Sequence, residues 1–170
     1  MKKILLTTVL ITASTTVAAN AHVEFDPDQV APSKQQSLSL VVPHDCTSKS
    51  KTTEVKIQLP KNLDTRSFIA GGVFQHGKII KSWSQKITTL GGKSYLDIKG
   101  PGLMAGPDTG KNKLIIKFTF TTPAATGTQL RFPTVQYCTK GASVSWVQPR
   151  PVDGSDPAES AKPVPVLNVK

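Results

Sequence analysis

The stretch LIIKFTF, from Leu114 to Phe120, decides the fold class of this chain. Every second residue from Leu114 onwards is large and apolar, and Lys117 and Thr119 occupy positions between them. An alternation with a period of two places the apolar side chains on one face of a β-strand, whereas an amphipathic helix repeats them every three or four positions. We therefore expect residues 114–120 to form a strand with one face in a hydrophobic core.

A second stretch with the same pattern lies upstream, where residues 53–59 alternate between polar and apolar up to Pro60. This pattern predicts another half-buried strand that ends at the proline. Further strands are expected at residues 37–42, 130–137 and 144–146. Within these, Pro133 predicts a strand edge or a bulge, because proline cannot donate to a sheet ladder.

The region from residue 61 to residue 112 has a weaker pattern. It predicts two or three short strands separated by Gly91-Gly92, and a long turn between Gly100 and Gly110. Beyond the first 21 residues, no window of 12 or more residues shows helical periodicity. Many short strands separated by Gly and Pro are typical of an all-β sandwich, which is the fold class that we expect.

Residues 1–21 have the features of a secretory signal peptide. Lys2 and Lys3 precede an uncharged run, and Ala19-Asn20-Ala21 matches the A-x-A pattern of a cleavage site. The run is too short for a membrane-spanning helix, and we expect no transmembrane segment in the mature chain. Cleavage would export the protein to the periplasm or the extracellular space. His22 would then begin a mature chain of 149 of the 170 residues, enough for one domain.

An N-terminal His22 carries two nitrogen donors on one residue. Its α-amine and its imidazole Nδ1 can close a chelate ring on one metal ion. An α-amine titrates near pH 8, well below a lysine, so a metal can displace its proton at neutral pH. The alternative is that the peptidase happens to expose a histidine that binds no metal.

The net charge of the chain is +10, and removal of Lys2 and Lys3 leaves +8 for the mature part. Basic chains suggest nucleic-acid binding, but here the lysines are scattered singly from Lys34 to Lys170. The chain contains neither a basic helix nor interleaved aromatic residues. We therefore expect a solvated basic surface and no nucleic-acid partner.

Cys46 and Cys138 are the only cysteines. In an oxidising compartment, two cysteines that are the only ones in a chain most simply form a disulfide with each other. Here that bond would stabilise the fold by about 4–5 kcal/mol in the chain-entropy model. A thiolate metal site is the alternative, but no C-x-x-C motif is present.

Motifs of common enzyme classes are absent. The sequence contains no HExxH, no G-x-S-x-G, no Walker loop and no dinucleotide-binding fingerprint. Its carboxylates show no pairing typical of general acid–base catalysis. We therefore do not expect an enzyme.

The other two histidines, Trp146 and Met104 also have side chains that occur in metal sites. His44 is expected to bond local backbone beside Cys46, and His76 to lie in an exposed turn. A tryptophan at position 146 on a strand is normally a core residue. Met104 is the only methionine of the mature part, which argues against the Met-rich sites that select Cu(I).

Several stretches resemble the YcnI-like family of exported bacterial copper-binding domains. They are His22-Val23-Glu24, LSLVVPHDC at 38–46, TTEVKIQLP at 52–60, FPTVQYC at 132–138 with VSW at 144–146, and PVPVLNV at 163–169. They are similar to that family's VPHGC, TTxVxVxIP, FPVVQxC with VxW, and PAPVLxL motifs. The order holds over nearly the whole mature chain and fails mainly between residues 61 and 112.

The resemblance implies an immunoglobulin- or fibronectin-III-like β-sandwich with a disulfide between Cys46 and Cys138. It also implies one Cu(II) ion bound by the amine and imidazole of His22, with Trp146 near the metal. The family's third ligand is a glutamate just before the strand that follows the Gly/Pro-rich turn.

This sequence departs from the family at that position, where Lys113 stands in place of the glutamate. Three interpretations remain open. The alignment is shifted and Asp108 is the ligand, or Glu24 or Asp26 substitutes for it, or copper binding is weak or lost.

We expect residues 22–148 to form the copper-binding sandwich and residues 149–170 a Pro-rich tail with a possible terminal strand. The expected function is a periplasmic Cu(II) carrier or buffer that works with another copper-handling protein of the envelope. One alternative is a copper-dependent oxygenase that adds His44 or His76 to His22. The other is an envelope interaction module without a metal.

Overall fold

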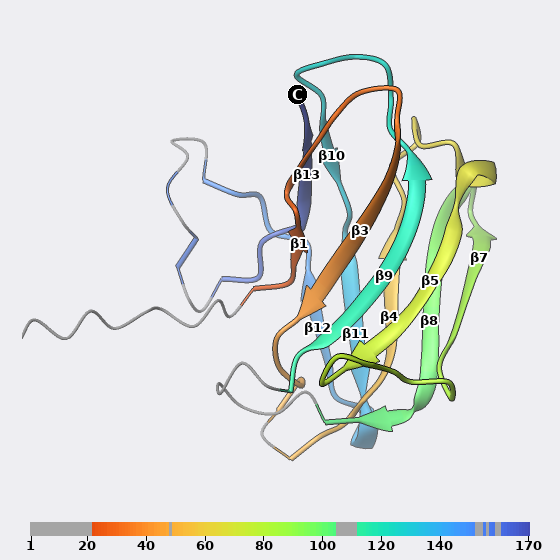
Figure 1. The fold of residues 1–170 in the computed structure, drawn as a ribbon. Helices are drawn as coiled ribbons and strands as arrows, with labels where there is room; N and C mark the ends of the chain where they lie inside the picture. Colours follow the sequence, from red (N-terminus) through yellow and green to blue (C-terminus); the bar gives the residue numbers. More distant parts are fainter. Residues whose placement is uncertain (1–21, 48, 105–111, 152–154, 156, 159–160) are drawn as a thin grey trace, which may run out of the picture.

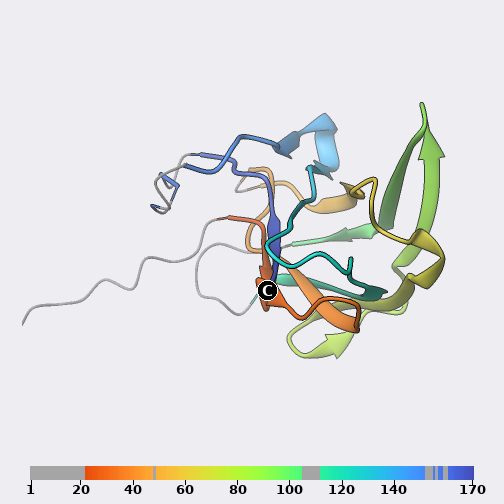
Figure 2. The ribbon, with the colours of Figure 1, turned by 90° about the horizontal axis from the view of Figure 1, so that it is seen from above.

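The computed structural model describes residues 22–47, 49–104, 112–151, 155, 157–158 and 161–170. Its strands form two layers that face each other across one hydrophobic core, as Figures 1 and 2 show. Each layer contains a five-stranded sheet, and a three-stranded sheet lies beside them. The predicted all-β sandwich is confirmed. The predicted signal peptide lies outside the described residues.

The elements are as follows. The first sheet contains, in spatial order, β1 (Glu24–Asp26), β3 (Gln35–Val42), β9 (Leu114–Thr121), β5 (Ile69–Gln75) and β6 (Lys78–Ile79). The second contains β12 (Ser143–Trp146), β11 (Thr134–Cys138), β4 (Thr52–Gln58), β8 (Lys93–Leu103) and β7 (Ser84–Leu90). The third contains β10 (Gln129–Arg131), β13 (Val166–Val169) and β2 (Gln29–Val30). Two 3₁₀ turns, η1 (Thr65–Ser67) and η2 (Thr139–Gly141), complete the described part, in which no helix is long and apolar enough to cross a membrane.

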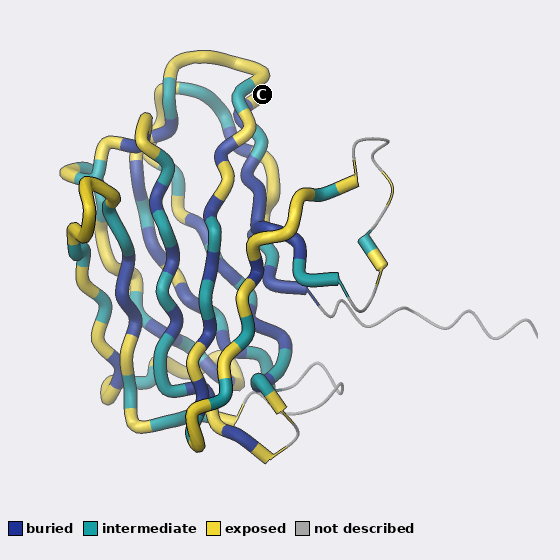
Figure 3. The backbone as a smooth tube through the Cα atoms, turned by 180° about the vertical axis from the view of Figure 1, so that it is seen from behind, coloured by how far each residue is buried: buried dark blue, intermediate teal, exposed yellow. Residues whose placement is uncertain are grey.

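Strand β9, the stretch with the clearest alternation, lies at the centre of the first sheet. Its four large apolar side chains at every second position are completely buried, and Lys117 between them is exposed. Figure 3 shows this alternation of buried and exposed residues along the strands of the sandwich. The Phe118 ring of β9 packs against Phe25 of β1 and Phe68, with ring centroids 6.0 Å and 5.4 Å apart. Complete burial of such a side chain contributes about 1.5–3 kcal/mol to stability.

The turn predicted between Gly100 and Gly110 is wrong in its first part, because β8 continues to Leu103. Gly100 lies against the indole ring of Trp83, and a Cβ atom at this position would overlap three atoms of that ring. Gly102 has a φ of 102°, which a residue with a side chain rarely adopts. These glycines therefore permit close packing and a local backbone twist within a strand.

The single strand expected over residues 130–137 is two strands, β10 and β11, that belong to different sheets. The chain changes sheet at Phe132-Pro133. The Phe132 amide donates to the Pro165 carbonyl (2.9 Å), and the Pro133 carbonyl accepts from the Gln58 amide (2.8 Å). Proline at the crossing point costs no ladder hydrogen bond.

The C-terminal apolar segment forms strand β13, which lies between β10 and β2. It runs antiparallel to β10 and parallel to β2, and its Leu167 and Val169 are completely buried in the core. The end of the chain is therefore part of the sandwich.

The predicted disulfide between Cys46 and Cys138 is present, with Cα atoms 6.1 Å apart. A buried polar network lies beside it. Thr52 Oγ1 donates to Asp45 Oδ1 (2.7 Å), and Gln136 Nε2 donates to Thr52 Oγ1 (2.7 Å) and to the His44 carbonyl (2.8 Å). Together the disulfide and this network fix the loop that carries His44.

Candidate metal centre

His22 lies two residues before the start of β1, and the register of the first sheet determines what lies near it. Strand β1 pairs with β3 so that Glu24 faces Val41, and β3 pairs with β9 so that Val42 faces Leu114. Continued past the strand ends, this register places His22 and Lys113 on either side of Pro43, the residue that follows β3. The two residues therefore lie at the same end of the sheet, with the end of β3 between them.

A pocket of about 260 Å³ lies at this position. Its lining consists of His22, Glu24, Phe25, Asp26, Val41 and Lys113. The structure thus brings together His22, Glu24 and Asp26, which are the two substitute carboxylates expected from the sequence, and Lys113, which the sequence comparison aligns with the YcnI-like glutamate. The third candidate, Asp108, lies outside the described residues.

The imidazole of His22 is held in one orientation by a backbone carbonyl. Its Nε2 lies 3.1 Å from the Ala158 oxygen, and only 8% of the residue is exposed. A carbonyl oxygen only accepts, so Nε2 carries a proton, and in the neutral form of the ring the lone pair is on Nδ1. Nδ1 is the ring nitrogen that can form a chelate with the α-nitrogen of the same residue. Such a carbonyl partner is the usual means by which proteins orient a metal-binding histidine.

Trp146 is the aromatic residue beside His22. It is completely buried, with its ring centroid 6.5 Å from that of His22 and 5.6 Å from that of His44. The ammonium of Lys162 lies 4.9 Å from the indole centroid. Trp146 Nε1 is buried without a hydrogen-bond partner within the part of the chain that the structure describes.

The other two histidines have different surroundings. His44 Nδ1 donates to the Asp45 carbonyl (2.7 Å), which is the local backbone bond expected from the sequence, and the ring also packs on Trp146. His76 is exposed in the turn between β5 and β6 and has a φ of 51°. His44 is therefore the histidine that shares a neighbour with His22.

The carboxylates near His22 are partly engaged by a cation. Glu24 Oε1 accepts from Arg150 Nη2 at 3.2 Å, and Asp26 is exposed. Among the residues that the structure describes, no group of three or more His, Cys, Asp or Glu side chains could hold a metal ion. Of the residues that line this pocket, His22 is the one with a side-chain nitrogen that can act as a neutral donor, and Lys113 offers no oxygen donor.

Sequence reasoning missed the contribution of the C-terminal segment to this site. Ala158, Arg150 and Lys162 all come from residues 149–165, which showed no periodicity. Gln148 holds this segment in place through backbone pairing. It forms an isolated parallel β-bridge with Pro163, and its carbonyl accepts a hydrogen bond from the Val164 amide (2.8 Å). The run Pro163-Val164-Pro165 is buried, and this apolar character was the one available signal.

A second charged cluster lies away from this site, on the outer face of β4 and β8. Lys56 Nζ lies 3.4 Å from Asp97 Oδ1, and Thr88 Oγ1 donates to Asp97 Oδ2 (2.6 Å). Burial of the ammonium lowers the pKa of Lys56, but the charge of Asp97 and its hydrogen bond outweigh this effect, and the pKa is raised. The cluster is a stabilising ion pair between neighbouring strands.

Comparison with known families gives a match in the C-terminal part of the chain. Residues 107–169, less than half of the chain, match the family described as a domain of unknown function, DUF1775. The matched segment includes the FPTVQYC, VSW and PVPVLNV motifs. No curated protein matches the chain in sequence.

Comparison with solved structures confirms the fold. An uncharacterised protein from Nocardia farcinica with an immunoglobulin-like fold is 22% identical, with a TM-score of 0.63 over 88% of this chain and 98% of that one. The major pilin SpaA of Corynebacterium diphtheriae is 16% identical, with a TM-score of 0.42 over 81% of this chain and 33% of the pilin. The Nocardia match shows an immunoglobulin-like sandwich, and the pilin match is too distant to add to it.

Proposed function

We propose that this protein is an exported Cu(II)-binding protein, a periplasmic carrier or buffer that uses His22 as its chelating residue. The observation that carries the proposal is the bond from His22 Nε2 to the Ala158 carbonyl, 3.1 Å long. It leaves the Nδ1 lone pair for a metal, beside a pocket and a buried tryptophan. The resemblance to the YcnI-like copper-binding domains supports the same assignment.

The donors of His22 suit Cu(II) better than other divalent ions. Cu(II) prefers tetragonal nitrogen and oxygen ligation and stands at the top of the divalent affinity order. An α-amine and an imidazole on one residue supply two nitrogens without any further chain ordering. The proposal requires that residues 1–21 are removed, because only then is the α-nitrogen of His22 an amine.

We propose binding without catalysis, and a copper-handling protein of the cell envelope as the partner that supplies or accepts the ion. One observation favours a second candidate. His44 and His22 pack against the same tryptophan, Trp146, so a two-histidine site of the oxygenase type is the alternative arrangement.

Two single variants distinguish these functions. His22→Ala removes the imidazole and should weaken Cu(II) binding on the order of 100-fold, about 3 kcal/mol, since it removes a ligand and the chelate ring. His44→Ala should leave Cu(II) affinity and the electron paramagnetic resonance spectrum nearly unchanged. A large loss in His44→Ala, together with oxidative turnover when a reductant is present, would favour the oxygenase. Unchanged affinity in His22→Ala would refute the proposed chelate.

A further inference from the structure

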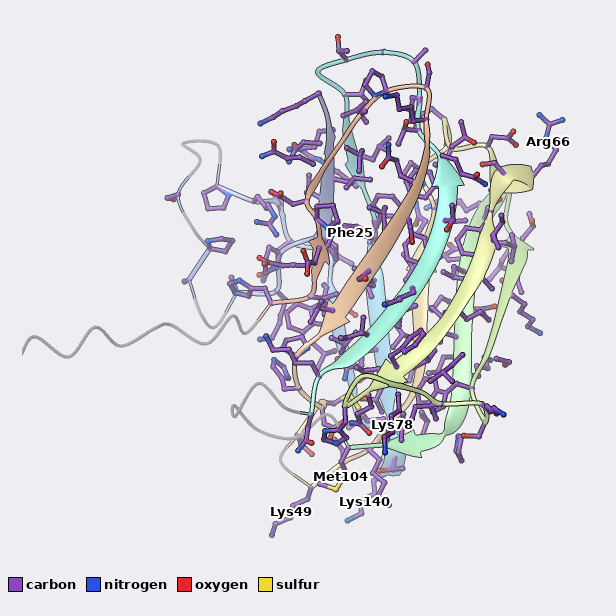
Figure 4. The ribbon with its side chains drawn as sticks, viewed as in Figure 1. Phe25, Lys49, Arg66, Lys78, Met104 and Lys140 are labelled. Atoms are coloured by element: carbon purple, nitrogen blue, oxygen red, sulfur yellow. A yellow bond between two sulfur atoms is a disulfide. The ribbon has the colours of Figure 1, made fainter. Side chains whose placement is uncertain are left out.

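We infer that one end of the sandwich docks on a membrane that contains anionic phospholipids. This surface, the basic end, consists of Lys49, Lys51, Lys78 and Lys140, which are all exposed, together with the exposed side chain of Met104. Figure 4 shows Lys49, Lys78, Lys140 and Met104 at the same lower end of the molecule. The inference goes beyond the proposed copper function and does not depend on it, because no metal takes part in the contact.

Backbone contacts hold three lysines of the basic end near one another. The disulfide joins the loop that carries Lys49 and Lys51 to η2, which contains Lys140. At this junction the Lys51 amide donates to Thr139 Oγ1 (3.0 Å), and the Thr139 amide donates to the Lys51 carbonyl (2.9 Å). The three lysines therefore form one group, although their loops lie far apart in the sequence.

Lys78 and Met104 are brought to this end by a second set of contacts. Lys78 begins β6 and pairs with Gln75, the last residue of β5. Gln75 Nε2 donates to the carbonyl of Met104 (2.7 Å), the residue that follows β8. Met104 is 47% exposed, so an apolar, unbranched side chain lies in solvent at an end of the molecule that is rich in cations.

The charge of the basic end is not balanced by acids of the loops at this end. The described residues of these loops are 43–47, 49–51, 76–77, 80–83, 104, 112–113 and 139–142. They include one acid, Asp45, which is 7% exposed and accepts from the amide (3.0 Å) and the hydroxyl (2.7 Å) of Thr52. None of the ion pairs among the described residues includes a lysine of the basic end. Residues 105–111 contain one aspartate and one lysine, so their sequence adds no net charge.

The acids of the neighbouring strands do not change this result. Glu54 of β4 and Glu24 of β1 each form an ion pair of 3.2 Å with a cation outside the basic end. Asp26 of β1 is exposed and lines the His22 pocket together with Glu24 and Lys113. Lys113 is therefore not counted in the basic end, because two carboxylates line the same pocket.

An anionic bilayer is the partner that fits these features best. Lipid head groups diffuse in the plane of the bilayer, so their phosphates can gather under cations that several loops present without a fixed geometry. Each lysine near an anionic surface contributes roughly a fivefold gain in affinity, and an apolar side chain such as Met104 adds to it by entering the head-group region. An acidic protein would instead need carboxylates at matching, fixed positions.

The test uses metal-free mature protein, residues 22–170, and co-sedimentation with vesicles. The vesicles contain phosphatidylcholine with about one third phosphatidylglycerol, or phosphatidylcholine alone, which should bind weakly. Lys49→Gln/Lys140→Gln should weaken binding to the anionic vesicles about 20- to 30-fold. The matched control is Lys61→Gln/Lys93→Gln, which lowers the net charge equally at the opposite end of β4 and β8. It should bind almost as the wild type does, because charges beyond about 10 Å are screened by salt.

Two further variants test the remaining parts of the surface. Lys78→Gln should weaken binding to the anionic vesicles about fivefold, and Met104→Ala about threefold. All of these variants replace exposed side chains, so their Tm values should equal that of the wild type. Raising the salt concentration to about 1 M should release the protein from the vesicles.

The outcomes separate this inference from the proposed copper function. Equal losses in the two double variants would refute it, because net charge alone would then explain binding. Absence of binding to the anionic vesicles at low salt would also refute it, and would leave an acidic protein as the ligand of the basic end. Neither result would bear on Cu(II) affinity, which is measured separately with the His22→Ala variant.

Discussion

The disulfide between Cys46 and Cys138 should stabilise this sandwich by several kcal/mol. The two residues are 92 positions apart, and the chain-entropy model gives about 4.6 kcal/mol for a closed loop of that length. For a domain of this size, each kcal/mol corresponds to about 2–4 °C in Tm. Reduction should therefore lower Tm by roughly 9–18 °C.

The assay is thermal unfolding followed by far-ultraviolet circular dichroism, with and without a reductant that does not absorb at the wavelengths used. The double variant Cys46→Ala/Cys138→Ala is the control, because its Tm should be low in both conditions. Alkylation of the exported, denatured protein without reductant should detect no free thiol. A Tm that changes by less than about 2 °C on reduction would refute the loop-entropy argument.

Three other predictions concern processing, the strand that sequence reasoning misplaced, and the ion pair on the second sheet. The intact mass of the exported protein should correspond to residues 22–170, and any other N-terminus would remove the chelate. Gly100→Ala should destabilise the fold by about 2 kcal/mol or more in urea unfolding, because its Cβ would overlap the Trp83 ring; an unchanged midpoint would show that the ring moves freely. Lys56→Met should lower the free energy of unfolding by about 1–2 kcal/mol in the same assay, because the buried carboxylate of Asp97 then keeps only its hydrogen bond from Thr88. An unchanged free energy of unfolding would show that water replaces the ammonium.

The fold could be predicted from the sequence wherever burial alone determines the pattern. Strands β9 and β4 each bury one face, and hydrophobic burial imposes a period of two on their residues. The prediction of a turn from Gly100 onwards was wrong, because this glycine allows close packing within a strand. Gly100 is small because Trp83 lies on it, and no local pattern distinguishes that role from a turn. The division into β10 and β11 could not be predicted either, since it depends on the backbone partners Gln58 and Pro165 at the crossing.

The candidate site could be predicted only in part. The cleavage pattern and the chemistry of an N-terminal histidine point to His22, and the register of β1, β3 and β9 places it at the same end of the sheet as Lys113. The partners from the C-terminal segment were missed, because a carbonyl such as that of Ala158 has no signature in a sequence. The role of Arg150 likewise follows only from its ion pair with Glu24, which the sequence does not show.

The most direct test of the central claim compares Cu(II) affinity of the mature chain, residues 22–170, with that of a chain retaining Ala21. The extra residue turns the α-amine of His22 into an amide and leaves the imidazole and its Ala158 bond in place. A chelating His22 predicts that the extended chain binds Cu(II) on the order of 100-fold more weakly, about 3 kcal/mol, with fewer nitrogen couplings in its resonance spectrum. Equal affinity of the two chains would contradict the claim and favour an envelope interaction module in which His22 binds no metal.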